Sequence, residues 1–486
     1  MGRTQVKSPG GAVDDTTPTA RPAQEGILRR QAARESAART YARALPIVPV
    51  RARGLTIEGA DGRRYLDCLS GAGALALGHN HPVVLEAIRK VLDSGAPLNA
   101  LDLATPVKDA FLTELFRTLP PGLADRARVR FCGPAADEAV ETASALVRAA
   151  TGRNGLLAFT GAGRGRTTRL REDASAHHNH VWATRLPYPQ DYRCPFGVGG
   201  EHGADLAARW AESLLDDPGS GVPLPAGMII KAVQGEGGVI PAPDTWLRRM
   251  RQLTADRSIP LIADEIETGV GRTGAFWAVE HSGVTPDVMV LSKAIGGSLP
   301  LAVVVHRDDL DTGETGTPAG TFPGNQLAMA AGTATLAHVR ENALAERAAR
   351  LGARMLHQLH ALVPEFACVG DVRGKGLMIG VELVDPEGEP GLPEAPGAEG
   401  GGGETSVMPG IGHRPSPAAP ELAAAIQQEC LRRGLIVGLG GRHASVVQLL
   451  PPLTITDEQA AAVLDRLADA VRAVARCRGD GTAAAP

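Results

Sequence analysis

The chain has 486 residues, of which 43% are hydrophobic and 21% are charged, and its formal net charge is −4. This length exceeds a single ordinary core and indicates an enzyme-sized globular protein with one large and one smaller domain. The slightly acidic balance excludes a basic surface for nucleic acid or a membrane, so we expect small molecules or a second copy of the chain as partners.

The cysteines and the N-terminal segment favour a cytoplasmic protein. The six cysteines are scattered, without the short spacing of a zinc site or a redox pair, so we expect reduced thiols. Residues 1–25 are polar and show no signal peptide, and no run is long enough to span a membrane. Because this segment has too few apolar groups to offset the entropy of ordering, we expect a disordered tail.

Short β-rich runs alternate with helical patterns in the middle of the chain. The alternation indicates an α/β fold with a mainly parallel sheet covered by helices, and we assign residues 101–330 to this large domain. In chain order, we expect a strand at 128–131, a helix at 136–150, strands at 155–160 and 228–233, a helix at 245–255, and strands at 260–264 and 288–292.

The flanking segments predict a smaller α+β domain. Residues 26–100 would supply its N-terminal part and residues 331–486 its C-terminal part, with a Gly-rich flexible surface insertion at 385–419. A helical pattern over residues 325–362 leads into this domain. Beyond the insertion we expect a helix at 420–433, short strands near Leu435 and Val446, and a final helix at 457–475.

A lysine and an aspartate stand at the ends of two predicted strands. Lys293 follows the apolar run 288–292, and Asp264 follows the run 259–263. Only six of the fifty cationic side chains are lysines, and lysine, unlike arginine, can lose a proton at modest cost and attack a carbonyl. Ligands of parallel sheets bind beyond the carboxyl ends of strands, where both residues would lie. From these two residues alone, a surface lysine in a loop is an equally good interpretation.

Four motifs extend this pattern: ADEIETG at 263–269, GRTG at 271–274, LSK at 291–293 and QGEGG at 234–238. Together they resemble the class III aminotransferases, which use pyridoxal 5'-phosphate. The resemblance covers about residues 27–474 and is strongest to the aminotransferases that interconvert 2,4-diaminobutyrate and aspartate 4-semialdehyde with glutamate and 2-oxoglutarate. It implies a fold type I transferase. Further segments that look like that subgroup lie at 64–69, 75–82, 105–111, 191–196 and 324–328.

The resemblance implies roles for residues around Lys293. Lys293 would bind the cofactor covalently and then shuttle a proton, while Asp264 would pair with the pyridinium nitrogen. Ile266 would pack on one face of the ring. Thr321 matches a position that donates a hydroxyl to the phosphate across a subunit interface, so the resemblance implies a homodimer.

The sequence departs from the family where the phosphate and the ring would bind. A loop that usually reads Ser/Thr-Gly-Ala is Ala135-Ala136-Asp137, which keeps backbone donors at a helix N-terminus but adds a carboxylate where the phosphate should lie. Gly163 replaces an aromatic residue that would stack on the ring, a contact worth roughly 1 kcal/mol or more. Arg164 instead offers a cation near the phosphate or a guanidinium plane for stacking.

Further positions change the charge of the site. Lys231 stands where the family has a glutamate, and Glu267 replaces a glutamine that bonds the ring hydroxyl; we hypothesise that these two residues pair with each other. Gln448 replaces an arginine that recognises substrate carboxylates, so Glu236 lacks its usual partner. Arg373 either anchors a substrate carboxylate or ties the small domain to the large one, and we favour the structural role.

The expected function is transfer of an amino group between a diamino acid such as 2,4-diaminobutyrate and 2-oxoglutarate or glutamate, with pyridoxal phosphate as cofactor. Two alternatives stay open: a pyridoxal phosphate enzyme of another reaction type, for example a decarboxylase, and a catalytically degenerate protein that keeps the fold. We expect no metal site, because the cluster His177, His178 and His180 has no acidic or cysteine partner at a suitable spacing.

Overall fold

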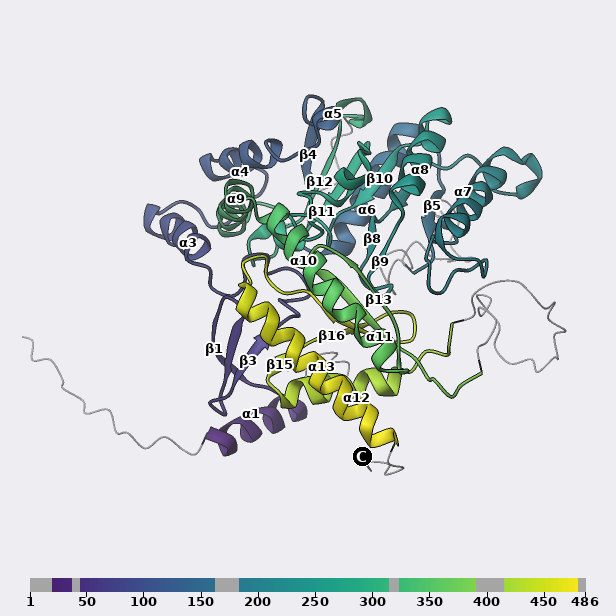
Figure 1. The fold of residues 1–486 in the computed structure, drawn as a ribbon. Coiled ribbons are helices and arrows are strands. Elements are labelled where there is room, and N and C mark those ends of the chain that lie inside the picture. The colour runs from purple at the N-terminus through teal and green to yellow at the C-terminus, as the bar shows by residue number, and fades with distance from the viewer. Residues whose placement is uncertain (1–19, 37–43, 162–182, 314–322, 390–414, 480–486) are drawn as a thin grey trace, which may run out of the picture.

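The computed structural model describes residues 20–36, 44–161, 183–313, 323–389 and 415–479. At its centre is a seven-stranded sheet in the order β4-β12-β11-β10-β7-β5-β6, in which β12 is antiparallel to its neighbours and the other neighbouring pairs are parallel (Figure 1). This arrangement confirms the expected mainly parallel α/β sheet. The strands are β4 (Ala127–Phe131), β5 (Leu156–Phe159), β6 (Ala183–Leu186), β7 (Gly227–Ile230), β10 (Leu261–Asp264), β11 (Val288–Leu291) and β12 (Val303–Arg307).

Helices cover both faces of this sheet because its inner strands are apolar on both sides. Helix α6 (Ala136–Thr151) packs on one face, and helices α7 (Gly200–Asp216) and α8 (Asp244–Asp256) pack on the other. The two faces are visible within β5, where Ala158 contributes to the core under α6 and Phe159 to the core under α7 and α8. The predicted helices at 136–150 and 245–255 are confirmed.

The other α-helices are α1 (Ala20–Arg34), α3 (Pro82–Ser94), α4 (Pro106–Phe116), α5 (Pro121–Ala124), α9 (Gln326–Glu341), α10 (Leu344–His360), α11 (Leu362–Glu365), α12 (Pro420–Arg432) and α13 (Asp457–Gly479). Among the described residues, no helix is long and apolar enough to cross a bilayer.

Smaller sheets join described segments from the N-terminal and C-terminal parts of the chain. In the sheet β1-β2-β3-β15, strand β15 (Leu435–Ile436) pairs in parallel with β3 (Arg64–Asp67), so N-terminal and C-terminal segments lie side by side (Figure 1). A second sheet has the order β13-β14-β17-β16, and β8 pairs with β9 as a two-stranded ribbon. The other strands are β1 (Pro49–Arg53), β2 (Thr56–Gly59), β8 (Val233–Gln234), β9 (Ile240–Pro241), β13 (Val369–Lys375), β14 (Met378–Leu383), β16 (Gly438–Gly440) and β17 (Val446–Leu449).

Two predicted elements have the wrong boundaries. The single helical pattern over 325–362 forms α9, α10 and α11, and the chain breaks between α9 and α10 at Ala343, whose φ of 48° cannot continue a right-handed helix. The strand expected at 228–233 ends at Ile230, and the chain then leaves the central sheet for the β8-β9 ribbon. Periodicity missed both breaks because neither is marked by glycine or proline.

The two segments expected to be disordered or flexible are partly ordered. Helix α1 begins at Ala20, inside the expected tail, and the Gln24 amide donates a hydrogen bond of 3.4 Å to the carbonyl of Pro46; residues 1–19 lie outside the described residues. In the expected insertion at 385–419, the two ends meet through a bridge between Val384 and Ala418. Residues 390–414 lie outside the described residues.

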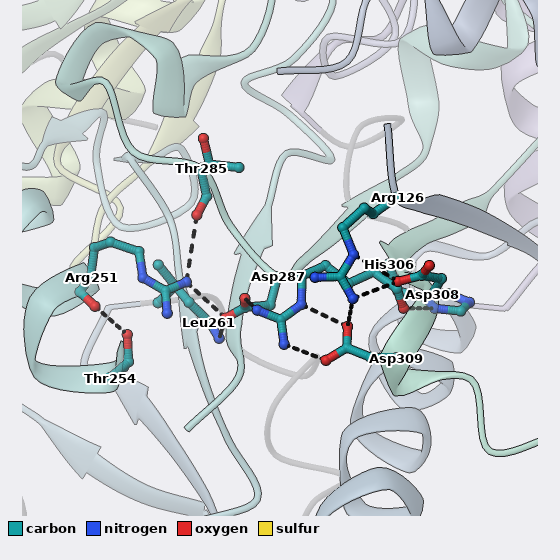
Figure 2. Close-up of polar contacts among 10 residues, drawn as sticks. Arg126, Arg251, Thr254, Leu261, Thr285, Asp287, His306, Asp308 and Asp309 are labelled. Carbon is teal, nitrogen blue, oxygen red and sulfur yellow. Dashed lines mark hydrogen bonds and ion pairs between the residues drawn. The ribbon is translucent and has the colours of Figure 1, made fainter. Parts of the chain in front are cut away.

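A buried carboxylate anchors the edge of the sheet at which β10 and β11 begin (Figure 2). Asp287 Oδ2 lies 2.7 Å from Arg251 Nη1 and accepts a hydrogen bond of 2.7 Å from the Leu261 amide. The other oxygen, Oδ1, lies 2.7 Å from Arg307 Nη1. Asp287 therefore connects helix α8, β10 and the end of β12 at the edge opposite the carboxyl ends of the parallel strands.

Candidate active site

Three charged side chains lie at the carboxyl ends of three neighbouring parallel strands. Asp264 is the last residue of β10, Lys231 directly follows β7, and Lys293 follows shortly after β11. The parallel register aligns Ala263 with Ile230, so the next residues, Asp264 and Lys231, are level across the sheet. The order of the strands thus places the aspartate between two lysines.

Each of the two lysines forms a short ion pair. Lys231 Nζ lies 2.7 Å from Asp264 Oδ2, and Lys293 Nζ lies 2.6 Å from Glu267 Oε1. The structure therefore gives Lys231 and Glu267 separate partners in place of the direct pair that we hypothesised. The Lys231 and Asp264 side chains are only 10% and 4% exposed, so water screens their attraction weakly.

The backbone after β10 holds the aspartate in place. The amide of Ile266 donates a hydrogen bond of 3.2 Å to Asp264 Oδ1, so each carboxylate oxygen has a donor. The Ile266 side chain is buried in the core cluster under helix α6, next to the strand ends.

Lys293 is positioned by its backbone as well as by its charge. Its φ of 54° lies in the left-handed region, which is unfavourable for a residue with a Cβ and which is often found at functional sites. The amine also donates a hydrogen bond of 2.8 Å to the carbonyl of Ala72, in the segment between β3 and α3. Sequence reasoning missed Ala72, because a backbone acceptor has no side-chain signature; the flanking Gly71 and Gly73 were the only signal.

The loop between β4 and α6 brings Ala135, Ala136 and Asp137 to the same edge of the sheet. Helix α6 begins at Ala136, and the N-cap Ala135 makes no side-chain hydrogen bond to the first turn, whose backbone N–H groups favour an anion. Asp137 and Glu138 stand in that turn, and the Glu138 carboxylate occupies the space that a Cβ on Gly133 would take. The first turn of α6 thus combines backbone N–H groups with two acidic side chains.

The end of β5 is tied to the QGEGG turn. The Gln234 amide donates a hydrogen bond of 2.8 Å to the carbonyl of Thr160, and a Cβ on Gly161 would clash with the same side chain. The three predicted cofactor-binding residues Gly163, Arg164 and Thr321 lie outside the described residues.

The predicted substrate-binding residues Arg373 and Gln448 lie in one row of the C-terminal sheet. Both are aligned with Gly380 of β14, which lies between their strands. Arg373 Nε donates a hydrogen bond of 2.9 Å to the carbonyl of Gly238, and Gln448 Nε2 donates one of 2.7 Å to the carbonyl of Gly235. The row is therefore held against the QGEGG turn.

Arg373 is held by several protein groups, whereas Glu236 is exposed. Arg373 Nη1 lies 2.8 Å from Asp371 Oδ2 and 2.6 Å from Glu382 Oε2, so its guanidinium joins the C-terminal sheet to the QGEGG turn. These contacts support the structural role that the sequence favoured. Glu236 is exposed, and its carbonyl accepts a hydrogen bond from the Gly441 amide.

Comparison with known proteins covers nearly the whole chain. Residues 37–471 match the family described as "Aminotransferase class-III". The chain is 49% identical to a diaminobutyrate–2-oxoglutarate aminotransferase of Rhizobium meliloti (strain 1021), over 96% of each chain. It is 40% identical to the enzyme of the same name from Haemophilus influenzae, with 92% of this chain and 94% of that protein covered.

Solved structures show the same fold. An amine transaminase from an uncultivated Pseudomonas species, in its pyridoxal-phosphate-bound form, superposes with a TM-score of 0.72 at 27% identity, over 98% of this chain and 99% of that chain. An acetylornithine aminotransferase from Elizabethkingia anophelis has a TM-score of 0.70 at 22% identity, over 93% and 99% of the two chains. The expected fold type I architecture is confirmed.

Proposed function

Because this chain belongs to the class III aminotransferases, we propose that it transfers an amino group between a diamino acid of the 2,4-diaminobutyrate type and 2-oxoglutarate. The observation that carries the substrate assignment is the 49% identity to a diaminobutyrate–2-oxoglutarate aminotransferase over almost the full length of both proteins. The chain is a transaminase of amino-acid metabolism, and its cofactor is pyridoxal 5'-phosphate.

The donor set at the strand ends fits this cofactor. Lys293 supplies an amine for the aldehyde, Asp264 supplies a carboxylate for the ring nitrogen, and the N-terminus of α6 supplies backbone donors for the phosphate. When bound, pyridoxal phosphate supplies an aldehyde that condenses with amines and a ring that accepts electrons from the substrate carbon. We assign covalent attachment to Lys293 and the ring nitrogen to Asp264.

The chain's own residues would act around that group. Freed from its attachment, Lys293 Nζ would take a proton from the carbon that loses the amino group. In the second half of the exchange it would give a proton to the carbon that gains the amino group. Its backbone conformation and the Ala72 carbonyl keep the amine near the strand ends. Lys231 Nζ and the Ile266 amide both lie against the Asp264 carboxylate and hold it in place. The contacts of Gln448 and Arg373 to the QGEGG turn would shape the substrate side.

A transamination assay tests the proposed function. Purified protein loaded with pyridoxal phosphate is incubated with 2,4-diaminobutyrate and 2-oxoglutarate, and we expect glutamate and aspartate 4-semialdehyde in equal amounts. Release of CO2 without glutamate would instead identify a decarboxylase. A protein that yields no product, and that stays colourless with pyridoxal phosphate, would be a degenerate member of the fold.

We further propose that the working unit is a homodimer in the cytoplasm, with a large domain at 101–330. Leu98, Leu101 and Leu103 are 50%, 50% and 65% exposed, an apolar surface that a second subunit would cover. This segment pairs with Asn325, shortly after the predicted phosphate ligand Thr321. The buried free cysteines of the described residues suit a reducing compartment. Light scattering that gives the mass of a single chain would contradict the dimer.

A further inference from the structure

Lys231 contacts the Asp264 carboxylate directly, although the proposed reaction gives Lys231 no role. Its Nζ lies 2.7 Å from Asp264 Oδ2, and the Ile266 amide already donates to Oδ1. The carboxylate that a cofactor ring would use is thus paired with a buried cation of the protein. Any further donor has to share this carboxylate with Lys231.

The position of Lys231 is fixed by the fold. It is level with Asp264 in the parallel register of β7 and β10, and its carbonyl accepts a hydrogen bond of 2.8 Å from the hydroxyl of Tyr188. Tyr188 is itself fully buried against Phe159 and Trp246, which anchors the backbone at this point. The pair is therefore built into the sheet edge, and it is not a contact between two mobile surface chains.

A carboxylate that is already neutralised by one cation stabilises a second cation less. The ring nitrogen of pyridoxal phosphate gains its proton, and with it much of its electron-accepting strength, from the attraction of Asp264. Lys293 and Glu267 also face this region, but they pair with each other at 2.6 Å and together add little net charge. Within the described part of the chain, Lys231 is the cation in contact with the Asp264 carboxylate, so it sets how strongly this carboxylate attracts the ring nitrogen.

We propose that Lys231 is a positioning residue that shares the Asp264 carboxylate with the ring nitrogen of the cofactor, and thereby lowers both the protonation of that nitrogen and the affinity for the cofactor. This inference rests on the proposed function, because it presumes that pyridoxal phosphate binds at Lys293. The site would then hold a cofactor with a weaker electron sink than an unshared aspartate provides.

The test replaces Lys231 by methionine, which keeps the length of the side chain without its charge, and by arginine, which keeps the charge. Native protein and variants are loaded with pyridoxal phosphate labelled with 15N in the ring. Nuclear magnetic resonance reports ring protonation, and equilibrium dialysis gives the dissociation constant. We expect Lys231→Met to shift the 15N resonance towards the protonated position and to tighten binding by about tenfold. Lys231→Arg should resemble the native protein.

Lys375→Met is the matched control. It removes a lysine that pairs with Asp244 at 3.0 Å, at the start of α8, and not with Asp264 or Glu267, and it should change neither readout. If Lys231→Met does not fold, Lys231→Gln carries the same expectation, because it also removes the charge. Circular dichroism of the cofactor-free proteins separates loss of folding from a change at the ring.

The outcomes separate the two proposals. If native protein and Lys231→Met bind the cofactor at Lys293 with the same affinity and the same 15N shift, the role of Lys231 is overturned and the proposed function stands. If neither protein attaches pyridoxal phosphate to Lys293, the proposed function fails and the inference fails with it. Tighter binding without a change in the 15N shift would also overturn the inference, because the ring nitrogen would then be insensitive to Lys231.

Discussion

The amine of Lys293 lies 2.6 Å from a carboxylate oxygen of Glu267, and both side chains are 15% exposed. The pair joins the segment after β11 to the segment after β10, at the edge where a ligand of this sheet would bind. The pair between Lys231 and Asp264 is the second ion pair at this edge, so each of the two lysines lies beside a carboxylate. A cofactor that reacts with Lys293 therefore has to open an existing ion pair.

Replacing Glu267 by glutamine should speed attachment of pyridoxal phosphate to Lys293. The amine cannot attack an aldehyde while it is held in the ion pair, and removing about 1.4 kcal/mol of attraction would raise the rate about tenfold. Stopped-flow absorbance measures the rate. Glu341→Gln, which removes a pair with Arg340 at 3.0 Å near the end of α9, is the control and should leave the rate unchanged. A slower Glu267→Gln variant would contradict the proposed obstacle.

Asp137→Ser should tighten cofactor binding. The variant removes a carboxylate from the first turn of α6 and adds a hydroxyl that can donate to a phosphate, so a tenfold decrease in the dissociation constant, about 1.4 kcal/mol, is expected. Equilibrium dialysis with pyridoxal phosphate provides the value, and dialysis with pyridoxal, which lacks the phosphate, should show no gain. Asp109→Ser, in the first turn of α4, serves as the matched control. Equal gains with both ligands would rule out a contact to the phosphate.

Glu265 makes stability depend on pH. Burial is the main cause that raises the pKa of this carboxyl from 4.5 to about 7, although Thr268 and the Val279 amide donate hydrogen bonds to it. Because the folded-state pKa is raised, the stabilisation is fully present below pH 4.5 and is lost as pH rises through 7. The free energy of unfolding therefore falls by about 2.5 kcal/mol between pH 5 and pH 8.

Glu265→Gln should remove this dependence. Denaturant unfolding at pH 5 and pH 8 would show the variant gaining on the native protein by about 2.5 kcal/mol at the higher pH. Glu280→Gln is a weaker comparison, since burial also raises the pKa of that carboxyl, though by less. An equal difference between native protein and Glu265→Gln at both pH values would show that Glu265 does not take up a proton on folding.

Asp287→Asn should destabilise the fold without weakening cofactor binding. Both carboxylate oxygens pair with arginines, and breaking such a buried arrangement costs about 3 kcal/mol (Figure 2). Asp309→Asn removes an exposed carboxylate that also pairs with Arg307 and should cost less than about 1 kcal/mol. Thermal unfolding compares the two variants. If they were equally stable, the anchoring role of Asp287 would be wrong.

The fold was predictable where hydrophobic pattern decides the structure. The apolar runs that end at Asp264 and precede Lys293 form neighbouring parallel strands. Strands of a parallel sheet are covered on both faces, and a short continuous apolar run is typical of them. Such runs do not reveal which strand is antiparallel, so the insertion of β12 between β4 and β11 was not predicted. The left-handed turn at Ala343 was missed because alanine ordinarily favours helix.

The places of the candidate site residues in the fold were easier to predict than their contacts. Lys293, Asp264, Ala135 and Gln448 all lie around the carboxyl edge or against the QGEGG turn, since strand order and motif position determine that much. The partners of charged side chains depend on distances of a few ångström that spacing does not encode. For this reason the sequence suggested a direct pair of Lys231 with Glu267, whereas each residue pairs across the sheet edge with Asp264 or Lys293.

The most direct test of the central claim is to trap the bond between Lys293 and the cofactor. Native protein is incubated with pyridoxal phosphate, reduced with borohydride, digested and sequenced by mass spectrometry. We predict that the pyridoxyl label resides on Lys293, that the visible absorbance of the complex disappears on reduction, and that Lys293→Ala shows neither signal. A label distributed over other lysines, or the same absorbance in Lys293→Ala, would contradict the assignment of this chain as a pyridoxal phosphate enzyme that acts through Lys293.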